Sequence, residues 1–451
     1  MTGAAARQPL AAAAGTSAGR PVTHQMARRP SLLHNRGFFR LWLTQTASLV
    51  GTWLTFVAIN VVMLRTTGSA TMVALAGIVQ MLPTVLVGPF LGGLADRFGG
   101  QTLLYSCNLF RAAMLVVLAV SPTPGMILVV AFLAGIGHAL FFPALNAVLP
   151  RLVGGRDAAV SANTWLSLSQ TACSVVGPAV GGLVVVSPGG PAACFALDAL
   201  SYIAAAVAIA TLPRAPAGTQ AVGAGMAAPG SAKPGRALPT LRDLWHASDV
   251  GLLVGWRFIR RSLPISALLA LAAPLLFAEG GVRAVQVVFA QRALGYTAFG
   301  YGLFVAVQGL GAFLGGAIAR RAALRWRGLR AVALAAVAMS ACVLALGVAP
   351  GHLAMPLLFG VALSWSAAVV LESAALQRAV PDEVRGRVAG VYGALVWASS
   401  MVGMAVTGRV ADVAGARAAV ATSGVVGGGG AALALGWYWW RTRRSRASNG
   451  T

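Results

Sequence analysis

The chain has 451 residues, of which 58% are hydrophobic and only 10% charged, and its mean hydropathy is +0.78. Water-soluble domains of ordinary size cannot bury so large a share of apolar side chains. The composition therefore excludes an ordinary soluble protein and places the chain in a lipid bilayer.

Long apolar segments occur throughout the chain. A helix needs about 20 apolar residues to cross a hydrocarbon core of ~30 Å, and it pairs its own backbone polar groups there. Twelve segments reach this length: 39–64, 71–95, 102–121, 125–149, 159–186, 192–212, 265–290, 298–319, 329–349, 352–377, 388–408 and 416–440. We therefore expect an all-α membrane protein with twelve transmembrane helices.

The longest polar stretch, 213–262, divides these segments into six and six. It is rich in Pro, Gly and Ala, and it ends in a segment, 241–261, that can form an interfacial helix. The first residues lack a signal-peptide pattern, so the first span is expected to remain as an uncleaved anchor. The expected organisation is a disordered cytoplasmic N-terminus (1–37), a six-helix half (38–212), a cytoplasmic linker with the interfacial helix (213–262), a second six-helix half (263–440) and a basic cytoplasmic tail (441–451).

The net charge of +24 suggests nucleic-acid binding, but its distribution favours another explanation. On the expected topology one side holds Arg7 to Arg40, Arg97, Arg151, Arg156, the linker, Arg320 to Arg330, Arg378 to Arg387 and Arg441 to Arg446; the other holds Arg65, Arg292, Arg409 and Arg417. This asymmetry follows the positive-inside rule and puts both termini in the cytoplasm. A nucleic-acid-binding domain would gather its charge on one folded surface. We expect a multi-pass protein of the inner (plasma) membrane with no nucleic-acid partner; the Ala, Gly and Arg excess indicates a bacterial, GC-rich source.

No pattern in the sequence indicates a cofactor or a metal. Cys107, Cys173, Cys194 and Cys342 lie singly in four different spans, without ligand spacing or a paired framework. The glycine runs at 309–316 and 425–432 lie within apolar spans, where small residues allow helices to approach closely rather than cradle a phosphate. Neither a Walker sequence nor a catalytic triad pattern is visible, so we do not expect an enzyme.

Two segments of the first half have similar counterparts in the second half. "GPFLGGLADR" (88–97) and "GAFLGGAIAR" (311–320) match at a constant offset of 223 residues, and the loop 149–165 has a similar counterpart at 380–397. Parallel repeats about an axis along the membrane normal are typical of secondary transporters that work by rocking.

Three motifs now give the chain a family resemblance. "GGLADRFGG" (92–100) resembles the loop signature of the major facilitator superfamily, matching at Gly92, Asp96, Arg97 and Gly99. "VVGPAVGG" (175–182) is similar to the antiporter signature of its drug-efflux branches, with Gly177, Pro178, Gly181 and Gly182 in register. "VPDEVRGRVAGV" (380–391) resembles the loop between the tenth and eleventh spans in its macrolide-efflux-like branch.

The resemblance has departures. Gly100 and Gln101 stand where the first signature usually has two basic residues, and Cys173 replaces the glycine that opens the antiporter signature. Thr52 occupies a place where relatives often have aspartate, which removes one commonly suspected proton site.

The resemblance implies a gating role for the first motif. In the family, its aspartate helps hold the two halves together while the carrier faces outward. Asp96 and Arg97 are expected at the membrane surface, between glycines that permit a tight turn. The alternative is an ordinary solvated loop pair.

Charged residues within spans are few, and each costs roughly 2.5–3.5 kcal/mol at a helix centre unless it faces protein or water. Glu279 and Arg283 lie four residues apart on the seventh span and can pair; Glu372 lies on the tenth. The family's architecture puts both spans beside the central cavity. Low-dielectric surroundings favour the protonated form of a carboxyl group, whereas a nearby arginine favours its ionised form. Proton binding and substrate binding could therefore compete for the same charge, and Glu372 and Glu279 are the proton-coupling candidates. The alternatives are a structural Glu279–Arg283 pair and a Glu372 that is hydrated permanently.

Other polar residues within spans are weaker candidates for a functional role. Arg111 and Asp198 fall on spans that are peripheral in the family, where mutual pairing or snorkelling is the expected role. The residues on cavity-lining spans that could contact substrate are Trp53, Asn60, His138, Asn146, Gln286 and Trp365. Packing or interhelical hydrogen bonding is the alternative for each.

The sequence thus predicts a secondary transporter, a proton-coupled exporter of amphipathic small molecules such as drugs or secondary metabolites. Its expected partners are the substrate, protons and the bilayer, and it is expected to act as a monomer. Import or uniport of a metabolite is the alternative within transport, and a membrane sensor or membrane enzyme is the alternative outside it.

Overall fold

The computed structural model describes residues 32–212, 253–325 and 329–448. All regular elements in these ranges are helices. The expected N-terminal segment up to residue 31 and most of the expected linker, 213–252, lie outside the described residues.

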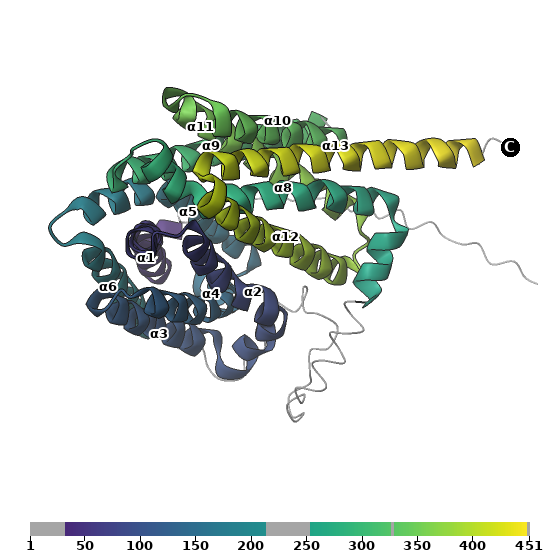
Figure 1. Ribbon diagram of the computed structural model, residues 1–451. Helices are drawn as coiled ribbons and strands as arrows, with labels where there is room; N and C mark the ends of the chain where they lie inside the picture. Colours follow the sequence, from purple (N-terminus) through teal and green to yellow (C-terminus); the bar gives the residue numbers. More distant parts are fainter. Residues whose placement is uncertain (1–31, 213–252, 326–328, 449–451) are drawn as a thin grey trace, which may run out of the picture.

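Two groups of six long helices make up the described chain, and Figure 1 shows them as separate bundles packed against each other. The first half contains α1 (Arg36–Thr67), α2 (Ala70–Phe98), α3 (Gly100–Val120), α4 (Pro124–Val153), α5 (Arg156–Val186) and α6 (Gly190–Ala210). The second contains α8 (Leu263–Val288), which continues as a π-helix, η3 (Phe289–Ala293), then α9 (Ala298–Arg325), α10 (Leu329–Val348), α11 (Ala354–Ala379), α12 (Arg385–Ala414) and α13 (Ala416–Ser448). Short 3₁₀ turns, η1 (Leu32–His34) and η4 (Gly351–Leu353), precede α1 and α11.

The expected spans correspond closely to these helices. Among the described residues, eleven helices are long and apolar enough to cross a membrane, which makes the protein a multi-span membrane protein. The second expected span corresponds to α2, of which the stretch Ala70–Leu86 qualifies only as a shorter apolar helix. One boundary differs from expectation, because α13 continues as a helix through most of the expected basic tail. Of the expected interfacial helix only residues 253–261 are described, and they are helical.

Local sequence explains where several helices begin and end. The Asn35 side chain accepts hydrogen bonds from the backbone N–H groups of Gly37 (3.0 Å) and Phe38 (3.1 Å), so it caps α1. Thr123 caps α4 in the same way, followed by Pro124 in the first turn. Gly99 separates α2 from α3 with φ of 78°, a backbone conformation that favours glycine.

The helix bundle has two ends, which we name by the chain. The termini side is the end where α1 begins and α13 ends; the opposite side is the end where α1 passes into α2 through Gly68 and Ser69. Because consecutive helices are joined by short turns, each half has helix connections alternating between these two sides.

The two halves meet through α5 against α9 and α2 against α12. On the opposite side the first pair packs backbone to backbone: a Cβ on Gly182 would lie 2.7 Å from the carbonyl oxygen of Ala298 and 3.1 Å from the Cα of Gly302. A Cβ on Gly408 of α12 would likewise lie 2.8 Å from the Cβ of Ala74. Small residues therefore allow this close approach.

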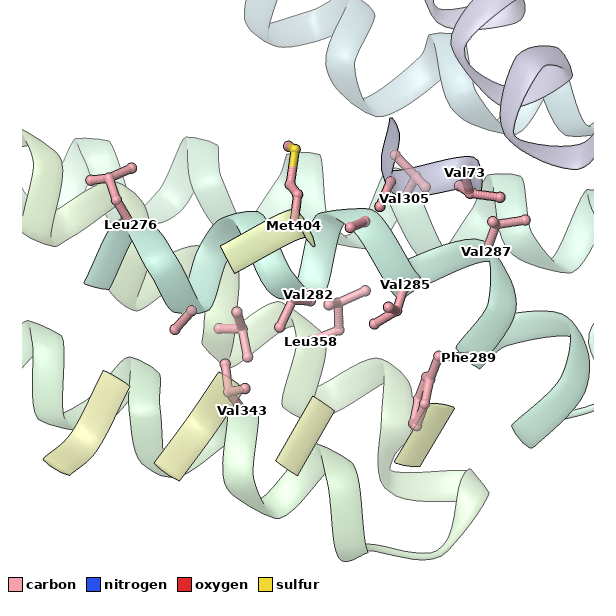
Figure 2. Close-up of a cluster of buried hydrophobic side chains, with 14 of the residues drawn as sticks. Val73, Leu276, Val282, Val285, Val287, Phe289, Val305, Val343, Leu358 and Met404 are labelled. Atoms are coloured by element: carbon pink, nitrogen blue, oxygen red, sulfur yellow. The ribbon is translucent and has the colours of Figure 1, made fainter. Parts of the chain in front are cut away.

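The buried core repeats this division. One large cluster of buried apolar side chains runs through the second half and joins the opposite-side part of the first half, including Val61 and Leu118. Figure 2 draws Val73 of α2 and Val287 of α8, which belong to this cluster from different halves, and the two helices are in contact. A separate, smaller cluster, which includes Phe38 and Leu149, fills the termini side of the first half. The continuous core thus joins the halves at one end of the molecule.

Toward the termini side the same helix faces are exposed. On α5, Gln170, Ser167 and Asn163 continue the face that brings Ser174 against Gly309 of α9, and all three are exposed.

The partner helices show the same change along their length. On α9, Phe313 is 41% exposed one turn beyond Gly309, and Arg320 farther along that face is also exposed. On α12, Trp397 is 42% exposed two turns from Met404, which contacts Gly77 of α2. The halves are therefore joined at the opposite side and present exposed faces toward the termini side.

Candidate functional site

Glu279 and Arg283 form an ion pair within α8. The Arg283 guanidinium contacts Glu279 Oε1 through Nε at 2.9 Å and Nη2 at 2.8 Å. The Glu279 side chain is 8% exposed, whereas that of Arg283 is 46% exposed although its neighbours Val282 and Ala284 are buried. The pair thus places a buried carboxylate behind an exposed guanidinium, in the second half of α8.

Gln286 lies one turn farther along the same face of α8. It is 2% exposed, and its Nε2 donates to Oε1 of Gln308 on α9 at 3.1 Å. The structure therefore gives this expected cavity residue a partly buried interhelical hydrogen bond, which was the alternative that the sequence left open.

Glu372 joins α11 to α12. The Tyr392 hydroxyl donates to Glu372 Oε1 at 2.7 Å, and the two residues are 8% and 4% exposed. A carboxyl group so placed has lost most of its contact with bulk water, and within the described residues it receives one hydrogen bond, from the Tyr392 hydroxyl. Sequence reasoning identified Glu372 but not Tyr392, which lies 20 residues away in the chain.

The other expected cavity residues differ in exposure. His138 and Asn146 on α4 are exposed, and the His138 ring packs edge-on against Phe142 with centroids 5.3 Å apart. Trp53 and Trp365 are half-buried beside the large core cluster. Asn60 is also half-buried and donates to the carbonyl of Phe56 within α1. His138 and Asn146 are thus the members of this set most open to a ligand.

The antiporter-like motif on α5 lies between two helices. Cβ atoms on Gly177 and Gly181 would meet Trp53 Cβ at 2.6 Å and Leu54 Cα at 3.0 Å, both on α1. Gly182 and the carbonyl of Pro178 face Gly302 of α9 in the other half. The motif therefore brings α5 into close contact with α1 on one face and with the second half on the other.

The first signature lies at the end of a helix instead of in a loop. Gly92, Asp96 and Arg97 belong to the last part of α2, and Gly99 alone separates it from α3. The side chains of residues 87–97 lie outside the described part of the chain, so the gating role of Asp96 stays a prediction. Gln101, one of the departures from the signature, donates to the carbonyls of Ile209 (2.9 Å) and Leu212 (3.1 Å) at the end of α6.

Arg111 and Asp198 have separate partners. Asp198 is 2% exposed and accepts hydrogen bonds from Thr55 (2.7 Å) and Ser201 (3.3 Å), while the Arg111 guanidinium lies over the Tyr202 ring, 4.2 Å from its centroid. No salt bridge is found between these two described side chains; Asp198 is held by hydroxyl donors and Arg111 lies against an aromatic face, and the expected role of the two residues in mutual pairing or snorkelling stays a prediction.

Two contacts across the halves were not found from the sequence. Asp412 of α12 accepts from Ser69 Oγ (2.7 Å) and from the N–H groups of Ala70 (2.6 Å) and Thr71 (3.0 Å), at the start of α2. Arg292 of η3 donates to the carbonyl oxygen of Gly68 at 2.7 Å. We call these hydrogen bonds the opposite-side contact.

The sequence gives a signal for one of the two residues that make the opposite-side contact. Arg292 is one of four arginines expected on the sparsely charged side. Nothing local marks Asp412 as a helix cap, because its partner segment is more than 340 residues away.

Metal binding has no support in the described part of the chain, where no three His, Cys, Asp or Glu side chains lie together in a way that could hold an ion. Of the four cysteines, Cys107, Cys173 and Cys194 are buried and Cys342 is partly buried, and none forms a disulfide.

The fold and the site define a class of protein: a multi-span helical membrane protein of two bundles, with charged and polar side chains between apolar helices near their contact. The sequence profile of the Major Facilitator Superfamily matches residues 41–400. The chain belongs to this family, whose members are transporters rather than enzymes.

Sequence relatives are known over part of the chain. It is 32% identical to macrolide efflux protein A of Streptococcus pyogenes over 178 residues, 38% of this chain and 44% of the relative. It is 30% identical to multidrug resistance protein MdtH of Salmonella paratyphi C over 127 residues, 28% of this chain and 31% of the relative. The chain thus matches less than half the length of these relatives.

Solved structures share the fold over most of the chain. The nucleoside transporter NupG aligns with a TM-score of 0.67 at 13% identity, covering 90% of this chain and 98% of that one. An inward-facing bacterial homologue of the human lysosomal transporter Spinster aligns with a TM-score of 0.68 at 15% identity, covering 92% and 98%.

Proposed function

We propose that the protein is a twelve-span, proton-coupled exporter of amphipathic small molecules that works by alternating access in a bacterial inner membrane. The termini side faces the cytoplasm in this proposal, in accord with the positive-inside rule. The observation that carries it is the Glu279–Arg283 pair within α8, in a molecule whose halves join at the opposite side and present exposed faces toward the termini side. The efflux proteins among the sequence relatives favour export as the direction.

The exposed faces offer a substrate both polar and aromatic contacts. His138 and Asn146 from the first half and the Arg283 guanidinium from the second are exposed, and Trp53 and Trp365 are half-buried. A cytosolic or leaflet-dissolved molecule would bind there, and rocking of the halves would then open the opposite side.

Protonation of the carboxylates supplies a coupling step. When Glu279 is ionised it holds Arg283; when it takes a proton, that attraction is lost and the guanidinium is free to move or to find another partner. Protonation of Glu372 would in the same way remove the charge to which the Tyr392 hydroxyl donates. Protons that enter from the outside would therefore favour substrate release and the return of the empty carrier.

The test measures transport of a fluorescent amphipathic dye into energised inverted vesicles, the direction that corresponds to export from the cell, with and without a protonophore. We compare the wild type with Glu372→Gln, Glu279→Gln and Asp96→Asn. Glu383→Gln is the matched control, because Glu383 is an exposed carboxylate in the turn after α11. Protonophore-sensitive export that is lost in a span variant and kept in the control supports the proposal. Export unaffected by the protonophore, or none across a broad dye panel, contradicts it and favours a metabolite importer or uniporter.

A further inference from the structure

A hollow of about 310 Å³ lies at the termini side of the second half, between the ends of α8, α10 and α11 and the side of α13. Its apolar wall comes from Pro264 and Leu268 of α8, Leu329 of α10, and Ala375 and Ala379 of α11. Arg378 of α11 and Tyr438 of α13 complete the lining. The hollow thus combines an aliphatic wall with one cation and one phenol.

The two polar side chains have no partner within the described residues. No hydrogen bond or ion pair is found there for the Arg378 guanidinium, which is exposed, or for the Tyr438 hydroxyl, which is half-buried. The nearby carboxylates have other surroundings: Glu372 accepts from Tyr392, and Asp382 pairs with Arg385. An anionic group at this place would therefore gain a cation that is not already neutralised.

The hollow lies at the level of a membrane surface. Tyr438 is 22 residues from the start of α13, or about 33 Å along the helix, which is close to the thickness of the hydrocarbon core. Figure 1 shows α13 running past the ends of α8 and α12 here. Trp439 and Trp440 are exposed at the same height, and the guanidinium groups of Arg443 and Arg444 lie 3.3 Å and 4.0 Å from the centroids of their rings. Indole rings and basic side chains are the usual residues of the headgroup region.

More positive charge surrounds the hollow. Arg441 lies one turn beyond Tyr438 on the same face of α13, and Arg330 follows Leu329 at the start of α10; both are exposed. Basic pockets between transmembrane helices suit the phosphate of an anionic lipid, while an aliphatic wall suits an acyl chain.

From this geometry we infer that the hollow is a binding site for an anionic phospholipid of the adjacent leaflet. The phosphate is held by Arg378 and Tyr438 with support from Arg441, and the first part of one acyl chain lies against Leu268, Leu329 and Ala375. This site is separate from the faces proposed for the transported substrate, and it does not depend on proton coupling.

The test measures lipid binding to the purified full chain by native mass spectrometry, with phosphatidylglycerol against phosphatidylcholine. We expect the wild type to retain phosphatidylglycerol preferentially. Arg378→Gln should weaken that binding about fivefold, the typical effect of one basic residue near a lipid surface. Ala375→Phe, which fills the wall without changing charge, should also reduce it. Arg320→Gln removes an exposed arginine on the same side that does not line the hollow, and it should bind as the wild type does.

Three results would overturn the inference. One is equal retention of the two lipids by the wild type. Another is an unchanged preference for phosphatidylglycerol in both Arg378→Gln and Ala375→Phe, each checked for folding by its thermal transition. The third is that inorganic phosphate alone protects the wild type against thermal unfolding as well as phosphatidylglycerol does, which would indicate a soluble anion and no role for the acyl chain.

Discussion

The two ends of the interface between the halves are built differently. At the opposite side, glycines bring helix backbones together, a common apolar core crosses between the bundles, and Asp412 and Arg292 bind backbone groups at Gly68–Thr71. Toward the termini side, the continuing faces of α5, α9 and α12 are exposed and include polar residues. The difference teaches that this conformation is held by contacts at one end. Substitutions at the opposite side should therefore change which side of the protein is accessible, and substitutions at the termini side should not.

The largest effect is expected for Gly302→Leu. Its side chain has no space against Pro178 and Gly182 of α5, and overpacking of this kind typically costs 1–3 kcal/mol. The halves should separate at the opposite side, which lowers the maleimide reactivity of a cysteine at Gln170 from the termini side at least fivefold. Gly429→Leu is the control, because no described atom lies within 4 Å of its Cβ position. Unchanged reactivity in Gly302→Leu would mean that this contact does not hold the conformation.

Asp412→Ala should have the next largest effect. The change removes the acceptor for one hydroxyl and two backbone N–H groups at the start of α2, a loss comparable to that of a helix cap, about 1–2 kcal/mol. Reactivity at Gln170 should fall roughly five- to thirtyfold from the termini side, with a partial effect in Asp412→Asn, which keeps one oxygen. Asp382→Ala, an exposed carboxylate in the turn after α11, is the control. A larger effect in Asp412→Asn than in Asp412→Ala would contradict this explanation.

Arg292→Met should shift accessibility less, since it removes one hydrogen bond to the Gly68 carbonyl from an exposed arginine, worth about 1 kcal/mol. Arg417→Met provides a matched comparison, because Arg417 donates to the carbonyl of Ala349 within the second half, at 2.7 Å. We expect Arg417→Met to lower the thermal transition without altering reactivity at Gln170. Equal changes of reactivity in both variants would show a general loss of stability instead.

The smallest effect is expected for Gly390→Ala at the termini-side end of α12. Gly390 is exposed, and no described atom lies within 4 Å of its Cβ position. Alanine should stabilise the helix by up to about 1 kcal/mol and leave accessibility unchanged, as measured by thermal unfolding and by reactivity at Gln170. A loss of stability would mean that this face is packed and would remove the contrast between the two ends.

The sequence predicted the helices well because each span must be both long and apolar. The caps at Asn35 and Thr123 and the break at Gly99 set the exact limits, which apolar length alone did not give. It also identified the Glu279–Arg283 pair, since a separation of four residues fixes the geometry within one helix. What it did not provide depends on chain segments far apart. Tyr392 as the partner of Glu372, Thr55 as the donor to Asp198, and Asp412 as a cap for α2 all require knowledge of which helices are neighbours.

The close approach of Gly182 and Gly302 near one end of their helices has a mechanical consequence. Contact between two backbones without intervening side chains can act as a fulcrum, about which one half turns on the other. Asn163 lies 19 residues from Gly182 on α5, about 28 Å along the helix axis, so a rotation of roughly 10° about the fulcrum would move it by about 5 Å. A small rotation hardly moves the atoms at the Gly182–Gly302 contact. Because α5 is long, the same rotation moves its other end far enough to open a path for a small molecule.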